Sequence, residues 1–280
     1  MVAENRAGRR EQLLWTIGST ALVIYALIPV AWLASLSLKP GADLGDGRFL
    51  PRSISLEHYR AVLHDPQFPA ALLNSVGIAS IATLLAVMLG MFVAYAVVRL
   101  QFPGRGAILA IALAIAMFPP ISIVGPLFNV WRILGLYDTW MGLVLPYMTF
   151  TLPLAIWILA AFFREIPWDL EKAARVDGAT PLQAFVRVIV PLTAPAVFTT
   201  AILVFMFAWN DFLFAISLTS TNAARTAPAA IAFFTGSSLF ELPTGSVAAA
   251  SMIVTIPVIL VVVLFQQRIV SGLTAGAVKG

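Results

Sequence analysis

Residues 164–183 read REIPWDLEKAARVDGATPLQ. The order of residue types predicts a short helix, a break and then a second helix. Pro167 suits the first turn of a helix, and Asp169 and Glu171 favour its positive N-terminal end. Gly178 suits the left-handed residue that ends a helix. We therefore expect the first helix to lie between Pro167 and Gly178.

The second helix is expected to begin with a cap. Thr180 is the predicted N-cap, Pro181 the first-turn residue, and Gln183 closes a capping box with Thr180. The helix should run over about 181–190 and stop near Pro191, because proline removes a backbone donor and clashes with the preceding turn.

The first helix carries one small and shallow face. Four residues share this face by their i, i+3, i+4 spacing, namely Leu170, Ala173, Ala174 and Asp177. Charge around it comes from Glu171, Lys172 and Arg175. Small residues let another surface approach the backbone closely, so the helix suits docking into a cleft on a cytosolic partner. A helix lying on the membrane and a solvated connector are the alternatives.

Long apolar stretches flank this segment on both sides. The chain is 60% hydrophobic and only 11% charged, whereas soluble domains carry roughly 25% charged residues. A helix needs about 20 apolar residues to cross the hydrocarbon core. The fold class expected is therefore all-α, a polytopic membrane protein whose domain 13–270 has six transmembrane helices, at about 13–37, 71–98, 107–131, 141–162, 194–218 and 247–267.

Basic residues predict the orientation of these helices. If the N-terminus is cytoplasmic, eleven Lys and Arg lie in inner segments and six in outer segments. Because cytoplasmic loops carry the excess of Lys and Arg, both termini are expected inside. This also explains the net charge of +4 without nucleic-acid binding. The inner segments are then 1–12, the tight turn 99–106, the loop 163–193 and the tail 271–280, and the long outer loops are 39–70 and 219–246.

Several kinds of chemistry find no support in the sequence. There is no Cys, and His58 and His64 lie six residues apart, which suits two solvated loop histidines better than a helical metal pair. No Gly-x-x-x-x-Gly-Lys-Ser/Thr loop is present to hold ATP. A membrane enzyme would need a convergent set of acids or histidines, and the spans offer only Asp211. A secondary transporter stays open, since a dimer could supply a missing half.

Asp211 lies inside the fifth predicted span, beside Asn210. A carboxylate there costs about 2.5–3.5 kcal/mol on insertion scales, so it should face the bundle or a water-filled path. One interpretation is a pathway or gate position that hydrogen-bonds a polar solute. The other is a polar pair that packs helices together.

Prolines interrupt two of the predicted spans. Pro119 and Pro120 in the third span and Pro257 in the sixth should kink or break their helices. Interrupted helices often line transport paths, although prolines in membrane helices are also common without such a role.

The loop resembles the EAA loop of the permease subunits of ABC importers. The pattern of that family is Glu-Ala-Ala, three residues, Gly, nine residues, and Ile-x-Leu-Pro. Lys172 stands where the pattern has Glu, and Glu171 precedes it. The matching positions are Ala173, Ala174, Gly178 and Pro191, with Val188 and Val190 in place of Ile and Leu.

The resemblance covers nearly the whole chain and points to the MalG-like branch of carbohydrate permeases. The stretches that carry it are Asn74-Ser75, Phe118-Pro119-Pro120, Trp209-Asn210-Asp211-Phe212 and the tail from Gly272 to Gly280. Within this branch, residues 162–184 and 234–250 look most like the permease of a trehalose importer. The resemblance alone implies this substrate.

The family implies a set of partners. These are a second homologous permease, two copies of an ABC ATPase that use ATP and Mg, and an extracytoplasmic sugar-binding lipoprotein. The chain itself would be a non-catalytic, multi-pass subunit of the plasma (inner) membrane that binds no cofactor or metal. The tail 271–280 would insert between the two ATPase subunits.

The resemblance also assigns roles to residues. Those expected to couple to the ATPase are Leu170, Glu171, Lys172, Ala173, Ala174, Asp177 and Gly178. Candidates for the translocation path are Asn210, Asp211, Pro119 and Pro120. The outer loop resembles a scoop that enters the binding protein, with Phe233, Phe234, Gly236 and Phe240 as candidates. Re-entrant packing of this loop against the bundle is the alternative.

Overall fold

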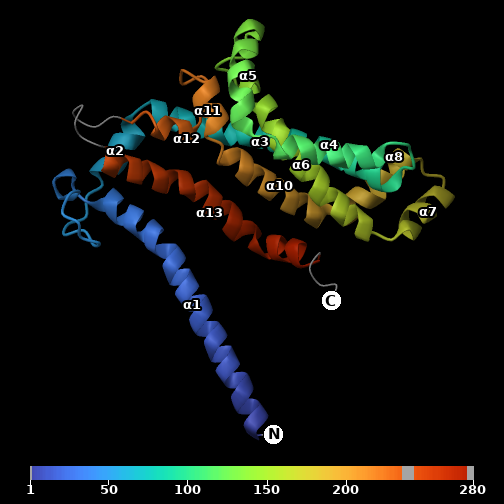
Figure 1. Ribbon diagram of the computed structural model, residues 1–280, viewed down its shortest axis with the longest axis horizontal. Coiled ribbons are helices and arrows are strands. Elements are labelled where there is room, and N and C mark those ends of the chain that lie inside the picture. Colours follow the sequence, from blue (N-terminus) through green and yellow to red (C-terminus); the bar gives the residue numbers. More distant parts are fainter. Residues whose placement is uncertain (1, 235–242, 276–280) are drawn as a thin grey trace. The chain divides into compact units, whose positions relative to one another are not determined.

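The computed structural model describes residues 2–234 and 243–275 and is helical throughout that part of the chain (Figure 1), without a strand there. The longer helices are α1 (Val2–Leu38), α3 (Gln67–Arg99), α4 (Arg105–Met117), α5 (Pro120–Leu134), α6 (Trp140–Glu165), α10 (Ala194–Trp209) and α13 (Thr244–Ala275). The shorter ones are η1 (Gly41–Asp43), α2 (Glu57–His64), α7 (Trp168–Val176), α8 (Pro181–Ala184), the π-helical η2 (Phe185–Ile189), α9 (Val190–Leu192), α11 (Leu213–Leu218) and α12 (Ala227–Ile231). The predicted all-α class is confirmed.

The chain divides into two compact units. Met1–Asp65 and Phe233–Thr255 form one, and Pro66–Ala232 and Ile256–Gly280 form the other. The second unit contains the loop 163–193 and Asp211. Most of the predicted functional residues therefore lie in this unit.

Four helical stretches are long and apolar enough to cross a membrane, and the number rises to six if each of two bent pairs counts as one span. The four are Glu11–Leu38, Gln67–Arg99, Trp140–Glu165 and Thr244–Phe265. The pairs are Arg105–Met117 with Pro120–Leu134, bent by 88°, and Pro181–Leu192 with Ala194–Trp209, bent by 76°. The third predicted span therefore consists of two helices, and the second pair joins part of the predicted loop 163–193 to the start of the fifth predicted span.

The third span breaks where the two prolines lie. Phe118 and Pro119 are extended, and Pro120 starts α5. Proline offers no amide donor and pushes the residue before it out of helical conformation, so the pair ends α4. The break predicted at Pro119 and Pro120 is confirmed. The helix α13, in contrast, runs through Pro257 without a break, so of the kink or break predicted there the break does not occur. A membrane helix tolerates such a proline where neighbours satisfy the freed carbonyl.

The first helix of the fifth span ends nine residues before the end predicted for a single helix 194–218. The helix α10 stops at Trp209 and α11 starts at Leu213. The side-chain amide of Asn210 donates to the backbone carbonyl of Met206 at 2.7 Å. The carboxylate of Asp211 accepts from the backbone amide of Ala215 at 3.1 Å. Short polar side chains that bond nearby backbone in this way compete with helical hydrogen bonding.

The core of the second unit lies between α3, α6 and α10, the helices with the most extensive mutual packing. The helices α3 and α6 run parallel, because the indole of Trp140 bonds Asn74 at their starts and Arg99 bonds the carbonyl of Phe163 at their ends. A Cβ on Gly90 would lie only 2.9 Å from that of Ala155, so the two backbones approach closely. Small residues at the contact permit this approach.

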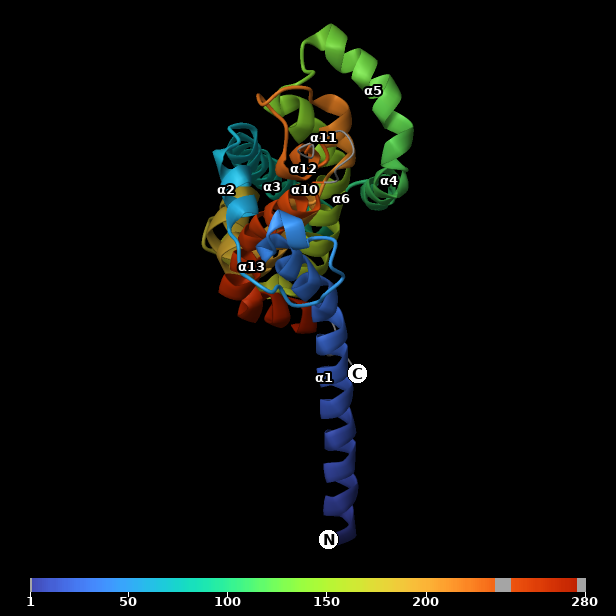
Figure 2. The same ribbon diagram turned by 90° about the vertical axis from the view of Figure 1, so that its left-hand side faces the viewer.

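The helix α5 departs from this core. It arches away from α6 and α10 in Figure 2 and buries no residue in the chain. Its large apolar side chains, such as Ile121, Val130 and Ile133, are exposed. This helix therefore presents an apolar surface that only lipid or another protein can cover.

In the first unit, the segment that follows α1 folds around a buried lysine. The side chain of Lys39 is fully buried and bonds Asp46 at 2.7 Å and the carbonyl of Arg48 at 2.6 Å. The bond to Lys39 lowers the pKa of Asp46. His58 and His64 lie on the helix α2, not in a loop as predicted, because α2 begins at Glu57. The ring of His58 packs against Gly245, so this histidine is largely buried, and only His64 is exposed.

Candidate functional site

The first helix of the loop forms as predicted, with a one-residue shift at its start. The helix α7 is capped by Pro167 and begins at Trp168, so the proline precedes the first turn. Gly178 has a φ of +89°, the left-handed conformation predicted for it. Side chains with a Cβ rarely adopt this conformation, and the position therefore favours glycine.

The second helix is held by the predicted capping box. The amide of Gln183 donates to Thr180 Oγ1 at 3.3 Å, and the amide of Thr180 donates to Gln183 Oε1 at 2.9 Å. Pro181 is the first helical residue. The helical path continues through η2 to Leu192, two residues past the predicted end, and then bends into α10.

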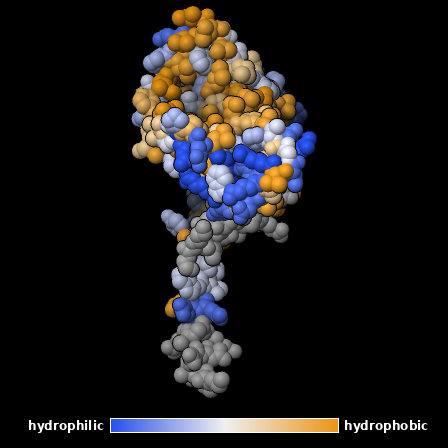
Figure 3. Space-filling model, turned by 90° about the vertical axis from the view of Figure 1, so that its right-hand side faces the viewer, coloured by the Kyte–Doolittle hydropathy of each residue, from blue (hydrophilic) through white to orange (hydrophobic). Residues whose placement is uncertain are grey.

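The small face of α7 is turned outward. Leu170 is 43% exposed, Ala173 and Asp177 are exposed, and Ala174 is half-buried. Figure 3 views the molecule from the side on which α7 and α8 lie in Figure 1 and shows a hydrophilic patch bordered by apolar surface. The face predicted for docking is thus available to a partner.

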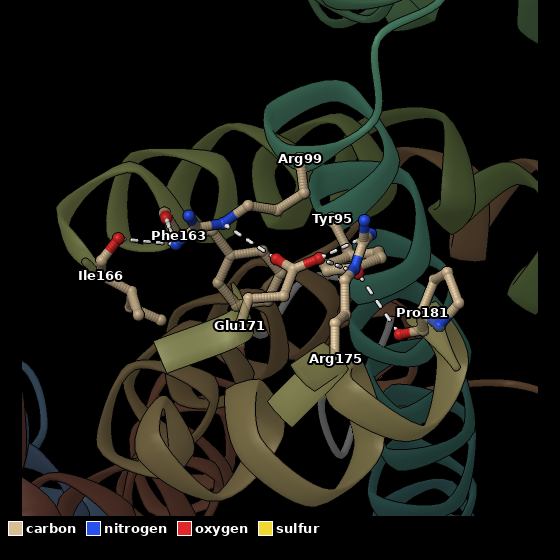
Figure 4. A network of polar contacts seen from close by, with 7 residues as sticks. All are labelled: Tyr95, Arg99, Phe163, Ile166, Glu171, Arg175 and Pro181. Atoms are coloured by element: carbon tan, nitrogen blue, oxygen red, sulfur yellow. Dashed lines mark hydrogen bonds and ion pairs between the residues drawn. The ribbon is translucent and has the colours of Figure 1, made fainter. Parts of the chain in front are cut away.

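Glu171 lies on the opposite face of α7 and is only 3% exposed. Its carboxylate accepts a hydrogen bond from the hydroxyl of Tyr95 at 2.9 Å and forms an ion pair with Arg175 at 3.0 Å (Figure 4). The hydroxyl of Tyr95 also lies 3.3 Å from the carbonyl of Pro181. Glu171, which the sequence placed among the charges around the docking face, instead attaches α7 and the start of α8 to α3.

Arg99 completes this attachment from the end of α3. One nitrogen donates to the carbonyls of Phe163 and Ile166, at 2.9 Å and 2.7 Å. Another lies 3.9 Å from the carboxylate of Glu171, and the guanidinium stacks 4.5 Å above the ring of Trp168. We call Tyr95, Arg99, Glu171 and Arg175 the anchor cluster. Sequence analysis missed it, although the i, i+4 spacing of Tyr95 with Arg99 and of Glu171 with Arg175 is a visible signal.

A second polar cluster joins the starts of α3 and α6 to the segment 219–227. The side-chain amide of Asn74 donates to the carbonyls of Asn222 and Arg225, at 2.9 Å and 3.0 Å. The hydroxyl of Ser75 accepts from the amide of Ala227 at 2.7 Å. Asn74 and Ser75, noted in the sequence only for their resemblance, therefore hold the segment 219–227.

Asp138 holds the same segment from the other side. Its carboxylate accepts hydrogen bonds from the amides and hydroxyls of Ser220 and Thr221, at 2.5 to 3.3 Å. Partial burial opposes the charged form, but these four bonds outweigh burial and lower the pKa of Asp138 below 3.8. The carboxylate is thus ionised near neutral pH.

The candidate path residues meet at one cavity of about 510 Å³. Three of the four line it, namely Pro120, Asn210 and Asp211, together with Phe150, Met206, Phe207, Leu213 and Phe214. The break after α4 and the break after α10 thus open onto the same space. Pro119 is not among the lining residues. A mostly apolar wall with two polar groups can hold a polar solute in a fixed orientation.

The predicted scoop residues lie only partly within the structure. Phe233 is exposed and Phe234 is half-buried. Gly236 and Phe240 lie outside the described residues, as do residues 276–280 of the tail.

The chain belongs to the binding-protein-dependent transport system inner membrane component family, whose model matches residues 86–274. It is therefore an ABC-transporter permease of the inner membrane. It is 59% identical to the trehalose transport system permease protein SugB of Mycobacterium tuberculosis, over 98% of this chain and 100% of SugB. It is 44% identical to the trehalose/maltose transport system permease protein MalG of Thermococcus litoralis, over 96% and 98%.

A solved structure shares the fold. A bacterial ABC transporter involved in the import of the acidic polysaccharide alginate contains a chain that is 26% identical, with a TM-score of 0.76 over 92% of this chain and 97% of that one. The predicted resemblance to the MalG-like branch, and to SugB within it, is confirmed.

The anchor cluster should hold α7 against α3. Removing one partner of a buried ion pair costs about 3–5 kcal/mol, so Glu171→Ala should speed amide hydrogen exchange in Trp168–Val176 by more than about tenfold. The measurement is hydrogen–deuterium exchange with mass spectrometry on the purified importer.

Asp169→Asn is the matched control. It breaks the exposed ion pair of Asp169 with Lys172, and such a pair contributes about 0–1 kcal/mol, so exchange should change by less than about fivefold. Equal exchange in Glu171→Ala and wild type would show that α7 is held by other contacts.

Proposed function

We propose that this chain is the permease subunit of an ATP-driven importer that moves trehalose into the cytoplasm. The substrate assignment rests on the 59% identity with SugB, which extends over 98% of this chain and 100% of SugB. The second relative, with 44% identity, carries trehalose in its name as well. Its name also includes maltose, so another neutral oligosaccharide or polyol is the second candidate.

ATP hydrolysis by the partner subunit is coupled to transport through α7. The partner ATPase hydrolyses ATP with Mg, and one copy docks on the exposed face made by Leu170, Ala173, Ala174 and Asp177. Gly178 shapes that contact from the turn that ends the helix, and Lys172 adds positive charge on the side of α7 that faces away from it. Glu171 acts from behind, because its buried carboxylate makes the docked helix move together with α3.

A second homologous permease covers part of the apolar surface. The exposed apolar side chains of α5 support this arrangement, since the described residues of the chain leave them uncovered. The second ATPase copy docks on that other permease. An extracytoplasmic sugar-binding lipoprotein delivers the solute on the opposite side, where Phe233 and Phe234 belong to the loop that meets it.

The orientation places both termini in the cytoplasm. The excess of Lys and Arg in the inner segments supports this orientation. The loop 163–193 then faces the ATPase, and the segment 219–227 faces outward. Trehalose passes the cavity at the two helix breaks, where Asn210 and Asp211 hydrogen-bond its hydroxyl groups.

The substrate can be tested in proteoliposomes that contain both permeases, the ATPase and the binding protein. Labelled trehalose should accumulate only with ATP inside the compartment that holds the ATPase. Unlabelled trehalose should compete more strongly than maltose. Uptake that survives omission of the ATPase would indicate a secondary transporter and contradict the proposal.

The docking face can be tested with Ala173→Trp, because a large ring on this face prevents close approach of the ATPase. Coupling energies between sites are typically 1–3 kcal/mol, so sugar uptake per ATP hydrolysed should fall at least about fivefold. The control is Leu182→Trp, at an exposed position of α8 outside that face. Normal coupling in Ala173→Trp would place the contact elsewhere.

The path assignment can be tested with Asp211→Asn. Asparagine keeps an oxygen to accept from the amide of Ala215, so the cap of α11 remains, but the charge is lost. A hydrogen bond to a charged group contributes about 1.5–3 kcal/mol, so uptake should fall by about tenfold or more while expression is retained. Unchanged uptake would assign Asp211 to capping alone.

A further inference from the structure

A polar cavity of about 360 Å³ lies on the inner side of α7. It is lined by Arg99, Leu100, Gln101, Trp168, Glu171, Lys172 and Arg175. Three of these residues are cationic and one is anionic, so the wall carries a net charge of about +2. Neither the family membership nor the coupling face accounts for this cavity.

Arg99 is the buried donor of the cavity. It is 4% exposed, its Nη1 atom has no hydrogen-bond partner within the described part of the chain, and its Nε atom has only the 3.9 Å ion pair with Glu171. A buried donor without a partner costs about 1–3 kcal/mol, and more when it is charged. An anion that enters the cavity would remove this cost.

The cavity faces away from the docking surface. At 100° per residue, Trp168, Glu171, Lys172 and Arg175 lie on one side of α7, whereas the small face around Ala173 lies on the other. Arg99 ends the candidate span Gln67–Arg99, and its bonds to Phe163 and Ile166 place it level with the end of Trp140–Glu165. The cavity therefore lies where two apolar helices end, at the depth of lipid headgroups.

The chemistry of the wall suits a phospholipid. Basic pockets between membrane helices on the cytoplasmic side bind anionic headgroups. Trp168 is 46% exposed and Leu100 is 37% exposed, so an indole and an apolar side chain lie next to the cationic groups. This pairing of apolar and cationic surface matches a molecule that has both an acyl chain and a phosphate.

We propose that this cavity binds the phosphate of an anionic phospholipid of the cytoplasmic leaflet, through Arg99, Lys172 and Arg175. The site rests on the proposed function only in placing α7 at the cytoplasmic surface. A bound headgroup there would bridge α3 and α7 through Arg99 and Arg175 of the anchor cluster.

The test is native mass spectrometry of the purified, assembled importer with phosphatidylglycerol or phosphatidylcholine of the same acyl chains. Each Lys or Arg near a charged membrane surface contributes about 1 kcal/mol, so Lys172→Gln and Arg175→Gln should each weaken phosphatidylglycerol retention about fivefold. Arg187→Gln is the control, an exposed basic residue of the same loop that does not line the cavity. It should leave retention at the wild-type value, and phosphatidylcholine should not be retained by any variant.

Three results would overturn the proposal. Equal phosphatidylglycerol retention in Lys172→Gln, Arg175→Gln and the control Arg187→Gln would show that retention follows the general charge of the surface and not this cavity. Occupancy by inorganic phosphate without any lipid preference would indicate a site for a free anion. Loss of the ATPase from Lys172→Gln with lipid retention unchanged would assign the cavity to an acidic side chain of that partner. Because retention is measured without transport, failure of the substrate assignment would leave this result standing.

Discussion

One buried carboxylate ties the loop to the membrane helices. Glu171 meets Tyr95 and Arg175 directly and Arg99 at the longer distance of an ion pair. A charge taken out of water is tolerated only with close partners, and here those partners come from two different helices. The position of α7, and with it the orientation of the exposed face, depends on this contact.

Behind this contact, α3 and α6 lie close to each other. Gly90 and Ala155 bring the two backbones together, and the buried cluster beside them contains Ala86, Ala94 and Ala160. Hydrocarbon provides no hydrophobic force to join helices, so close packing of small residues and interhelical hydrogen bonds must do so. The two helices consequently end at one level, where Arg99 can reach both the carbonyl of Phe163 and the start of α7.

Much of this could be predicted from the sequence. Local signals were sufficient for the left-handed Gly178 and for the capping box of Thr180, because each depends on residues within one turn. Apolar length and the low charge content were sufficient for a helical membrane domain. The break at Pro119 and Pro120 followed from the missing amide donors.

The errors have a common physical origin. Asn210 and Asp211 ended a helix because their side chains bond the nearby backbone, and a hydropathy window averages over that effect. Glu171 looked like a solvated charge because its partner Tyr95 lies 76 residues away in the sequence. His58 looked exposed because only the fold brings Gly245 against its ring. Pairings between distant segments cannot be read from local pattern.

The parallel pair of α3 and α6 is fastened at both ends, by Asn74 with Trp140 and by Arg99 with Phe163. Between Asn74 and Arg99 the helix is about 38 Å long at 1.5 Å per residue. Because the two helices are joined near both ends and pack along their length, they cannot slide past each other and should move as one rigid body. A displacement of α7 at one end of the pair would therefore be transmitted to the segment 219–227 at the other end.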